Sequence, residues 1–112
     1  MRLSEVIKVL NLKVENIANP DAIISSAYAS DLLSDVMGKA KSGQIWITMQ
    51  THKNVAAIAS LKDIPAVVII NNGKPEKDMI IHAKNENVAV LITDLPCYEF
   101  CAALHKLINC EI

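Results

Sequence analysis

The sequence predicts an α/β fold in which a mostly parallel sheet lies between two layers of helices, and three observations support it. Predicted strands alternate with predicted helices along most of the chain. The strands at 66–70 and 88–92 contain only apolar residues, as expected for strands covered on both faces. The length of 112 residues suits one domain with a hydrophobic core of its own. We therefore expect residues 1–112 to form a single three-layer α/β/α domain with right-handed crossovers.

Residue spacing and turn residues define the expected elements in order. The first helix begins at Ser4, a candidate N-cap, and ends at Asn11, which tolerates the left-handed conformation. The second helix opens after Ser30 and ends at Gly43. Pro96 is expected in the first turn of the last helix. The side chains predicted to face the core from the second helix are Leu32, Leu33, Val36, Met37 and Ala40. The predicted strands are 12–15, 22–26, 44–49, 66–70 and 88–92, and the predicted helices 4–11, 30–43, 54–61, 76–85 and 96–108.

Charge and composition exclude several classes of protein. Eleven basic and twelve acidic residues give a net charge of −1 without a basic block, and only 4% of residues are aromatic, so we expect no nucleic-acid partner. The longest apolar run, 64–70, is far shorter than the roughly 20 residues that span a bilayer, so we expect no membrane partner. Three cysteines in a chain that does not begin like a signal peptide predict free thiols and a cytoplasmic location.

The familiar catalytic motifs are absent from the sequence. The three glycines stand far apart, so neither a phosphate-binding P-loop nor a dinucleotide-binding turn can form. The nucleophile elbow of hydrolases and the zinc-protease motif are also missing. We therefore predict that the chain is not an enzyme and carries no cofactor. One acid–base alternative remains, in which His52 works with Asp31 or Asp94, and a hydrogen-bonded loop histidine is the simpler interpretation.

Polar residues follow four of the predicted strands. Ligands of open parallel sheets bind beyond the carboxyl ends of the strands, where these loops meet. We therefore expect a small polar or anionic ligand at this edge. The candidate binding residues are Ser26, Tyr28, Asp31, Gln50, Thr51, His52, Asn54, Asn71, Asn72, Gly73, Thr93 and Asp94. Several of these residue types also cap helices and turns, so capping alone is the alternative interpretation for any one of them.

The last predicted helix carries a stripe of possible metal ligands. Cys97, Cys101 and His105 recur every four residues and therefore share one face, which would suit zinc or an iron–sulfur group. Leu104 and Ile108 lie on the same face, so we interpret the cysteines as buried apolar residues. The sequence thus predicts no metal site.

Several segments resemble the freestanding short members of the DRTGG-domain family. The segments are 27–37, 46–59, 68–75 and 90–94 with 98–99, and the resemblance covers residues 4–108. Its most specific part is Asp31-Leu32-Leu33-Ser34-Asp35-Val36. The family is similar to the N-terminal domain of HPr kinase/phosphorylase, whose catalytic P-loop domain is missing here. The resemblance therefore implies an α/β sandwich of the MurF and HPr-kinase N-domain kind.

The resemblance also has consequences for function. Related domains are fused to CBS-domain pyrophosphatases and to phosphotransacetylases, where they look like regulatory or dimer-forming modules. The family's Asp-Arg element would fall near 50–52, and its Thr-Gly-Gly element near 71–73, where this chain keeps only Gly73. We expect a non-catalytic, homodimeric regulatory module with a small-molecule ligand at the strand-end loops. The alternative is a docking subunit of a larger metabolic or redox complex, in which the Ala-rich helix 54–61 contacts a protein partner.

Overall fold

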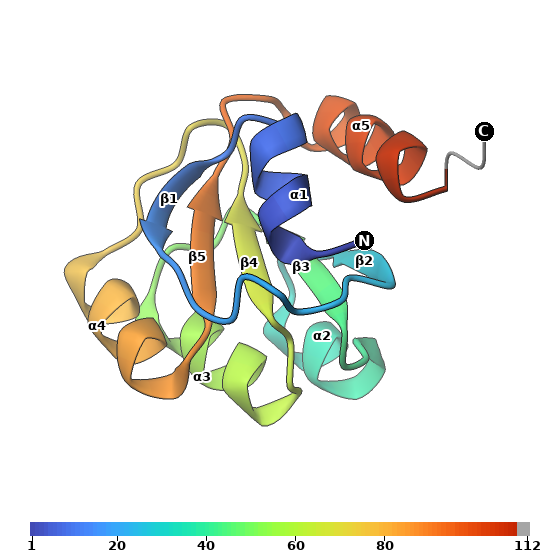
Figure 1. The fold of residues 1–112 in the computed structure, drawn as a ribbon. Helices are drawn as coiled ribbons and strands as arrows, with labels where there is room; N and C mark the ends of the chain where they lie inside the picture. The colour runs from blue at the N-terminus through green and yellow to red at the C-terminus, as the bar shows by residue number, and fades with distance from the viewer. Residues whose placement is uncertain (110–112) are drawn as a thin grey trace.

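A five-stranded sheet forms the middle layer of the computed structural model, which describes residues 1–109 (Figure 1). The strands lie in the order β1-β5-β4-β3-β2. The four strands from β2 to β5 are parallel to their neighbours, and β1 pairs antiparallel with β5. The strands are β1 (Lys13–Asn16), β2 (Ser26–Ala29), β3 (Gln44–Thr48), β4 (Ala66–Ile69) and β5 (Ala89–Ile92).

Five helices cover the two faces of this sheet. Figure 1 shows α2, α3 and α4 on one side and α1 and α5 on the other. The predicted three-layer α/β/α class is therefore confirmed. The helices are α1 (Leu3–Val9), α2 (Leu33–Lys39), α3 (Lys53–Leu61), α4 (Lys77–Glu86) and α5 (Cys97–Asn109). None of these helices has both the length and the apolar character that crossing a membrane requires.

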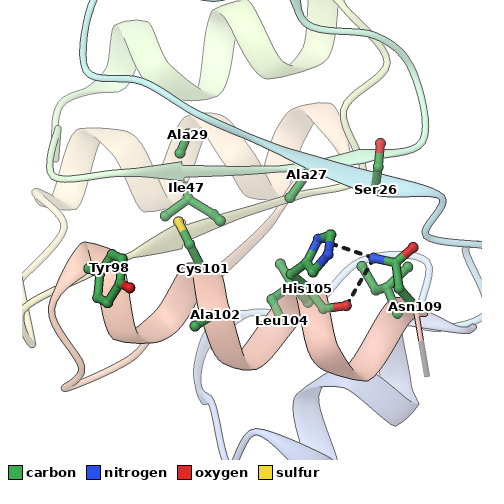
Figure 2. A pocket seen from close by; sticks show the side chains of 11 residues that line it. Ser26, Ala27, Ala29, Ile47, Tyr98, Cys101, Ala102, Leu104, His105 and Asn109 are labelled. Carbon is green, nitrogen blue, oxygen red and sulfur yellow. Dashed lines mark hydrogen bonds between the residues drawn. The ribbon is translucent and has the colours of Figure 1, made fainter.

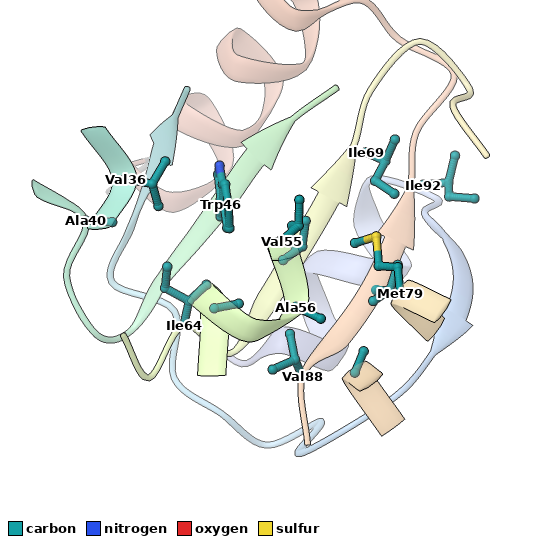
Figure 3. Close-up of a cluster of buried hydrophobic side chains, with 14 residues drawn as sticks. Val36, Ala40, Trp46, Val55, Ala56, Ile64, Ile69, Met79, Val88 and Ile92 are labelled. Carbon is teal, nitrogen blue, oxygen red and sulfur yellow. The ribbon is translucent and has the colours of Figure 1, made fainter. Parts of the chain in front are cut away.

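Each face of the sheet has its own hydrophobic core. On one face, Trp46 and the alternate residues of β4 and β5 pack against α2, α3 and α4 (Figure 3). On the other face, Ile45 and Ile47 pack with Leu3 of α1 and Phe100 of α5. All residues of β4 and β5 are buried, as their apolar sequences predicted. The small side chains Ala56 and Ala59 of α3 are also buried in the first core.

The strand predicted at 22–26 is wrong, because β2 begins at Ser26. The prediction followed the apolar pair Ile23 and Ile24. The structure uses these two residues differently: Ile24 is buried against α1 and β3, and Ile23 forms an isolated antiparallel bridge with Arg2. The strand instead consists of Ser-Ala-Tyr-Ala, whose pairing with β3 outweighs its modest strand propensity.

Two details of the predicted helices also differ. The second helix spans only Leu33–Lys39 instead of 30–43, so Leu32 lies before it and is 64% exposed. Met37, also expected in the core, lies within α2 but is 42% exposed. The first helix is capped two residues earlier than expected: Arg2, not Ser4, is its N-cap, and the Arg2 N–H donates to Glu5 Oε1 at 2.9 Å. The remaining elements lie within a few residues of their predicted ranges.

Candidate functional site

The loops after β2 and β3 are joined by hydrogen bonds around one aspartate. The Asp31 carboxylate accepts hydrogen bonds from Thr48 Oγ1 at 2.8 Å and from the Met49 N–H at 2.7 Å. Gln50 Nε2 donates to the Asp31 carbonyl at 3.1 Å, and Gln50 Oε1 lies 3.1 Å from His52 Nε2. Because an amide oxygen only accepts, His52 carries a proton on Nε2 in this arrangement. We call Asp31, Thr48, Gln50 and His52 the β2–β3 loop cluster.

Strand β3 holds this cluster in place. Thr48 ends the strand and is 1% exposed, so its hydroxyl needs a partner inside the protein, which Asp31 provides. Two residues earlier, Trp46 Nε1 donates to the Ser30 carbonyl at 2.9 Å and fixes the preceding loop. The Asp31 carboxylate is therefore occupied by Thr48 and Met49, and His52 is oriented by an amide rather than by a carboxylate. This arrangement lacks the Asp31–His52 contact that the acid–base alternative requires.

The loops after β4 and β5 are joined differently, through the backbone. The Asn71 N–H donates to the Leu95 carbonyl at 2.9 Å, and the Asn72 N–H donates to the Thr93 carbonyl at 2.8 Å. The Leu95 N–H donates to Thr93 Oγ1 at 3.2 Å, and the Gly73 N–H donates to Ile70. We call Asn71, Asn72, Gly73, Thr93 and Leu95 the β4–β5 loop cluster. The backbone N–H groups of this cluster donate to other groups of the protein, so they are not free to bind an anion.

The conformation of the β4–β5 loop cluster explains its residue types. Asn71 and Asn72 have positive φ angles of 58° and 54°, a region that Asn tolerates better than other side chains. Gly73 is required for another reason: a Cβ at this position would lie 2.7 Å from Ile69 Cγ2 and 3.2 Å from the Ile70 carbonyl oxygen. Gly73 is the residue that this chain keeps from the family's Thr-Gly-Gly element, and it lies where there is no room for a side chain.

Helix α3 begins between the two clusters. Its N-cap is His52, whose side chain makes no capping hydrogen bond, and its first turn carries the exposed residues Lys53 and Asn54. The Thr51 carbonyl accepts a hydrogen bond from the Glu76 N–H at 2.9 Å, which links the two halves of the edge. Asp94 is exposed in the turn after β5. A helix N-terminus carries partial positive charge, so this position favours an anionic group.

Two of the predicted binding residues lie away from these loops. Ser26 begins β2, and its Oγ accepts a hydrogen bond from Gln44 Nε2 at 3.0 Å. Tyr28 donates its hydroxyl hydrogen to Asp35 Oδ2 of α2 at 2.8 Å. This hydrogen bond lowers the pKa of Asp35, with a further contribution from Ser30, and the same contact raises the pKa of Tyr28. Both residues therefore connect elements of the scaffold.

A cavity of about 440 Å³ lies between β2 and α5. Figure 2 shows Cys101 and His105 pointing from α5 toward β2 and β3. Among the residues that line the cavity are Ser26, Ala27, Ala29, Ile47, Cys101 and His105. The sequence did not predict this cavity, because its floor depends on where β2 pairs and the range of β2 was wrong. The small side chains of Ala27 and Ala29 are the feature of the sequence that could have indicated the cavity.

The cysteines of α5 are less buried than expected. Cys97 is exposed and Cys101 is partly buried, and their sulfur atoms lie 3.9 Å apart. Burial, together with the neighbouring Cys97, raises the pKa of Cys101 to about 11. His105 lies one turn further on, where Asn109 Nδ2 is 3.2 Å from its Nδ1. Across residues 1–109, His, Cys, Asp and Glu side chains form no group of three or more suited to a metal ion. Cys110 lies outside the described residues.

These observations define a small α/β domain with a mostly parallel sheet and a polar edge at the carboxyl ends of its strands. No protein-family model and no curated protein sequence matches the chain. Among solved structures, it is similar to the CBS and DRTGG domains of the regulatory region of Clostridium perfringens pyrophosphatase, in complex with the activator diadenosine tetraphosphate. The TM-score is 0.69 at 15% sequence identity, and the match covers 92% of this chain and 45% of that chain. This likeness confirms the DRTGG-like fold predicted from the sequence.

Proposed function

We propose that the chain is a non-catalytic regulatory module that binds a small anionic ligand at the β2–β3 loop cluster. The observation that carries this proposal is the position of Gln50 and His52 directly before the N-terminus of α3. A hydrogen-bonding histidine, an amide side chain and the positive end of a helix suit a phosphate or carboxylate group. Lys53, exposed in the first turn, adds a positive charge.

The type of ligand is suggested by the structural neighbour. The pyrophosphatase regulatory region was determined with diadenosine tetraphosphate, a molecule with several phosphate groups. Only 4% of residues in the present chain are aromatic, so base stacking has few partners here. We therefore expect recognition through the phosphates rather than through the bases.

Isothermal titration tests this proposal with three probes: diadenosine tetraphosphate, ATP and inorganic phosphate. The test variant is the double substitution Gln50→Ala, His52→Ala. The control is His82→Ala, Asn85→Ala, which likewise removes one amide and one imidazole side chain, from α4. We expect the test variant to weaken binding by at least about tenfold, because one hydrogen bond to a charged group contributes about 1.5–3 kcal/mol. Equal heats for both double variants, or no heat with any probe, would exclude this site.

We also propose that the module is a homodimer. Among the described residues, strand β2 pairs only with β3, so its other edge is open there, and the cavity beside it is lined mainly by apolar residues. Open edges and apolar surfaces of this kind favour association. Light scattering at micromolar concentration is expected to give twice the 12.2 kDa chain mass. A 12.2 kDa species would refute the dimer without affecting the ligand site.

A docking subunit is the second candidate, and the same uncovered β2 edge supports it. In the Ala-rich helix α3, which was expected to contact a partner, Ala56 and Ala59 pack inside the first core, so a partner would meet the other face of this helix. Copurification of a stoichiometric protein partner, combined with no heat in the titrations, would favour this function. The cytoplasmic location stays a prediction from the sequence.

A further inference from the structure

We propose that Cys97 and Cys101 form a two-thiolate binding site for a thiophilic divalent cation of the Zn²⁺ type. The two thiols lie on consecutive turns of α5, at its beginning, with 3.9 Å between the sulfur atoms. Within residues 1–109, neither cysteine is in a disulfide. This pair is separate from the strand-end loops and independent of the proposed function.

The sulfur–sulfur distance fits the geometry of such a cation. Zn²⁺ binds thiolates tetrahedrally at about 2.3 Å, which places two thiolate sulfurs of one site ~3.8 Å apart. The observed 3.9 Å therefore leaves both sulfurs within reach of one ion without a change in the helix backbone. Soft thiolate ligands also select zinc over harder cations such as Mg²⁺ and Ca²⁺.

Exposure makes the pair accessible. Cys97 is exposed at the start of α5, and Cys101 is partly buried and lines the cavity beside β2 (Figure 2). A cation can therefore approach from solvent, and an apolar wall covers only the Cys101 side. With two protein ligands, the remaining two positions of a tetrahedral ion are left to water. This open coordination differs from that of a closed structural site, which has four protein ligands.

His105 is not a ligand in this proposal. It continues the stripe of four-residue spacing, yet its Nδ1 lies 3.2 Å from Asn109 Nδ2, and no group of three metal-binding side chains forms within residues 1–109. The site is therefore the cysteine pair alone. Binding converts two thiols into thiolates: each S–H bond breaks, each sulfur forms one bond to the cation, and two protons pass to solvent.

The cation would connect two successive turns of α5. Such a link stabilises the beginning of the helix, in the same way that contacts four residues apart stabilise helices in general. Because α5 forms one wall of the cavity, binding is also expected to restrain that wall. The consequence is a rise in melting temperature on addition of Zn²⁺.

The test uses the full chain with Cys110→Ser, so that only the thiols of α5 remain. Zn²⁺ is titrated in competition with a chromophoric chelator, and Co²⁺ serves as a spectroscopic substitute whose thiolate charge-transfer bands report sulfur ligands. We expect about one equivalent of cation per chain and a rise in melting temperature. Cys97→Ser and Cys101→Ser, which are nearly isosteric, should each weaken binding by at least about tenfold. His105→Ala is the matched control and should change neither readout.

Four results would overturn the proposal. The first is the absence of thiolate charge-transfer bands with Co²⁺. The second is unchanged affinity in either cysteine variant. The third is loss of binding in His105→Ala, which would require a three-ligand site. The fourth is binding by the wild-type chain that disappears with Cys110→Ser alone. Circular dichroism of each variant verifies that the helices are retained.

Discussion

The two halves of the strand-end edge are built in different ways. In the β2–β3 loop cluster, side chains bond to one another and to the backbone, with Asp31 at the centre. In the β4–β5 loop cluster, the contacts run mainly between backbone groups, and the side chains of Asn71 and Asn72 are exposed. The same polar residue types thus form a side-chain network in one half and fix the chain conformation in the other. The comparison predicts that the two halves respond to different substitutions.

The largest effect is expected in the backbone-built half. Gly73→Ala should lower the free energy of unfolding by about 2–3 kcal/mol, because the new methyl group would overlap with Ile69 Cγ2 at 2.7 Å. Urea denaturation measures this change. Gly38→Ala is the control, since a Cβ at that position meets nothing within 4 Å. If Gly73→Ala were as stable as the wild type, the close approach of Ile69 to position 73 would not limit the size of the residue there.

The next effect tests the half that is built from side chains. Asp31→Ala should lower the free energy of unfolding by about 1–2 kcal/mol, because the Thr48 hydroxyl and the Met49 N–H both lose their acceptor. The comparison is Asp94→Ala in the other half, where the carboxylate is exposed and a change within about 0.5 kcal/mol is expected. If both aspartates had the same effect, the distinction between the two halves would be wrong.

A smaller effect separates backbone conformation from side-chain chemistry. Asn71→Ala should cost about 1 kcal/mol, because alanine is strained at a φ of 58°. Asn71→Gly removes the same side chain but accepts this φ, so its stability should stay within about 0.5 kcal/mol of the wild type. Thermal or urea unfolding distinguishes the two variants. Equal losses would mean that the Asn71 side chain, rather than its conformation, stabilises the loop.

The smallest effect concerns pH. The hydrogen bond from Tyr28 holds the pKa of Asp35 below its ordinary value of 3.8 in the folded chain. This contribution to stability is therefore present above that pH and is lost as the pH falls through the lowered pKa. Tyr28→Phe should make the acid side of the stability curve shallower. Tyr98 is 82% exposed, so Tyr98→Phe should leave the stability curve unchanged. The same flattening of the acid side in Tyr98→Phe would show that the effect does not come from the Tyr28–Asp35 hydrogen bond.

The sequence was sufficient to predict the layered architecture, because apolar runs and helical spacing are local patterns that recur along the chain. The apolar runs of β4 and β5 and the spacing of the helices predicted the layers. For β2 the local signal pointed to Ile23 and Ile24, whereas the strand is determined by pairing with β3, which is a long-range contact. The exposure of Leu32 has a related origin, because the second helix begins only at Leu33.

The sequence predicted that polar loops lie at the carboxyl edge of the sheet, but it did not predict which of their side chains contact one another. Asp31 and Thr48 are 17 residues apart, and nothing local indicates that they bond to each other. The hydrogen bonds from the Asn71 and Asn72 backbone N–H groups to the loop after β5 are likewise invisible in the sequence, since Asn is common both in binding loops and at positive φ. The cavity and the spacing of the two sulfurs depend on where α5 lies against β2.

The most direct test of the proposed ligand site is an amide chemical-shift map of the chain with diadenosine tetraphosphate. The account predicts that the largest shifts occur at residues 30–32 and 49–54, around the β2–β3 loop cluster and the start of α3. It also predicts that His52→Ala reduces these shifts at the same ligand concentration. Shifts confined to β2 and α5 would contradict the account and place the ligand in the cavity between these two elements.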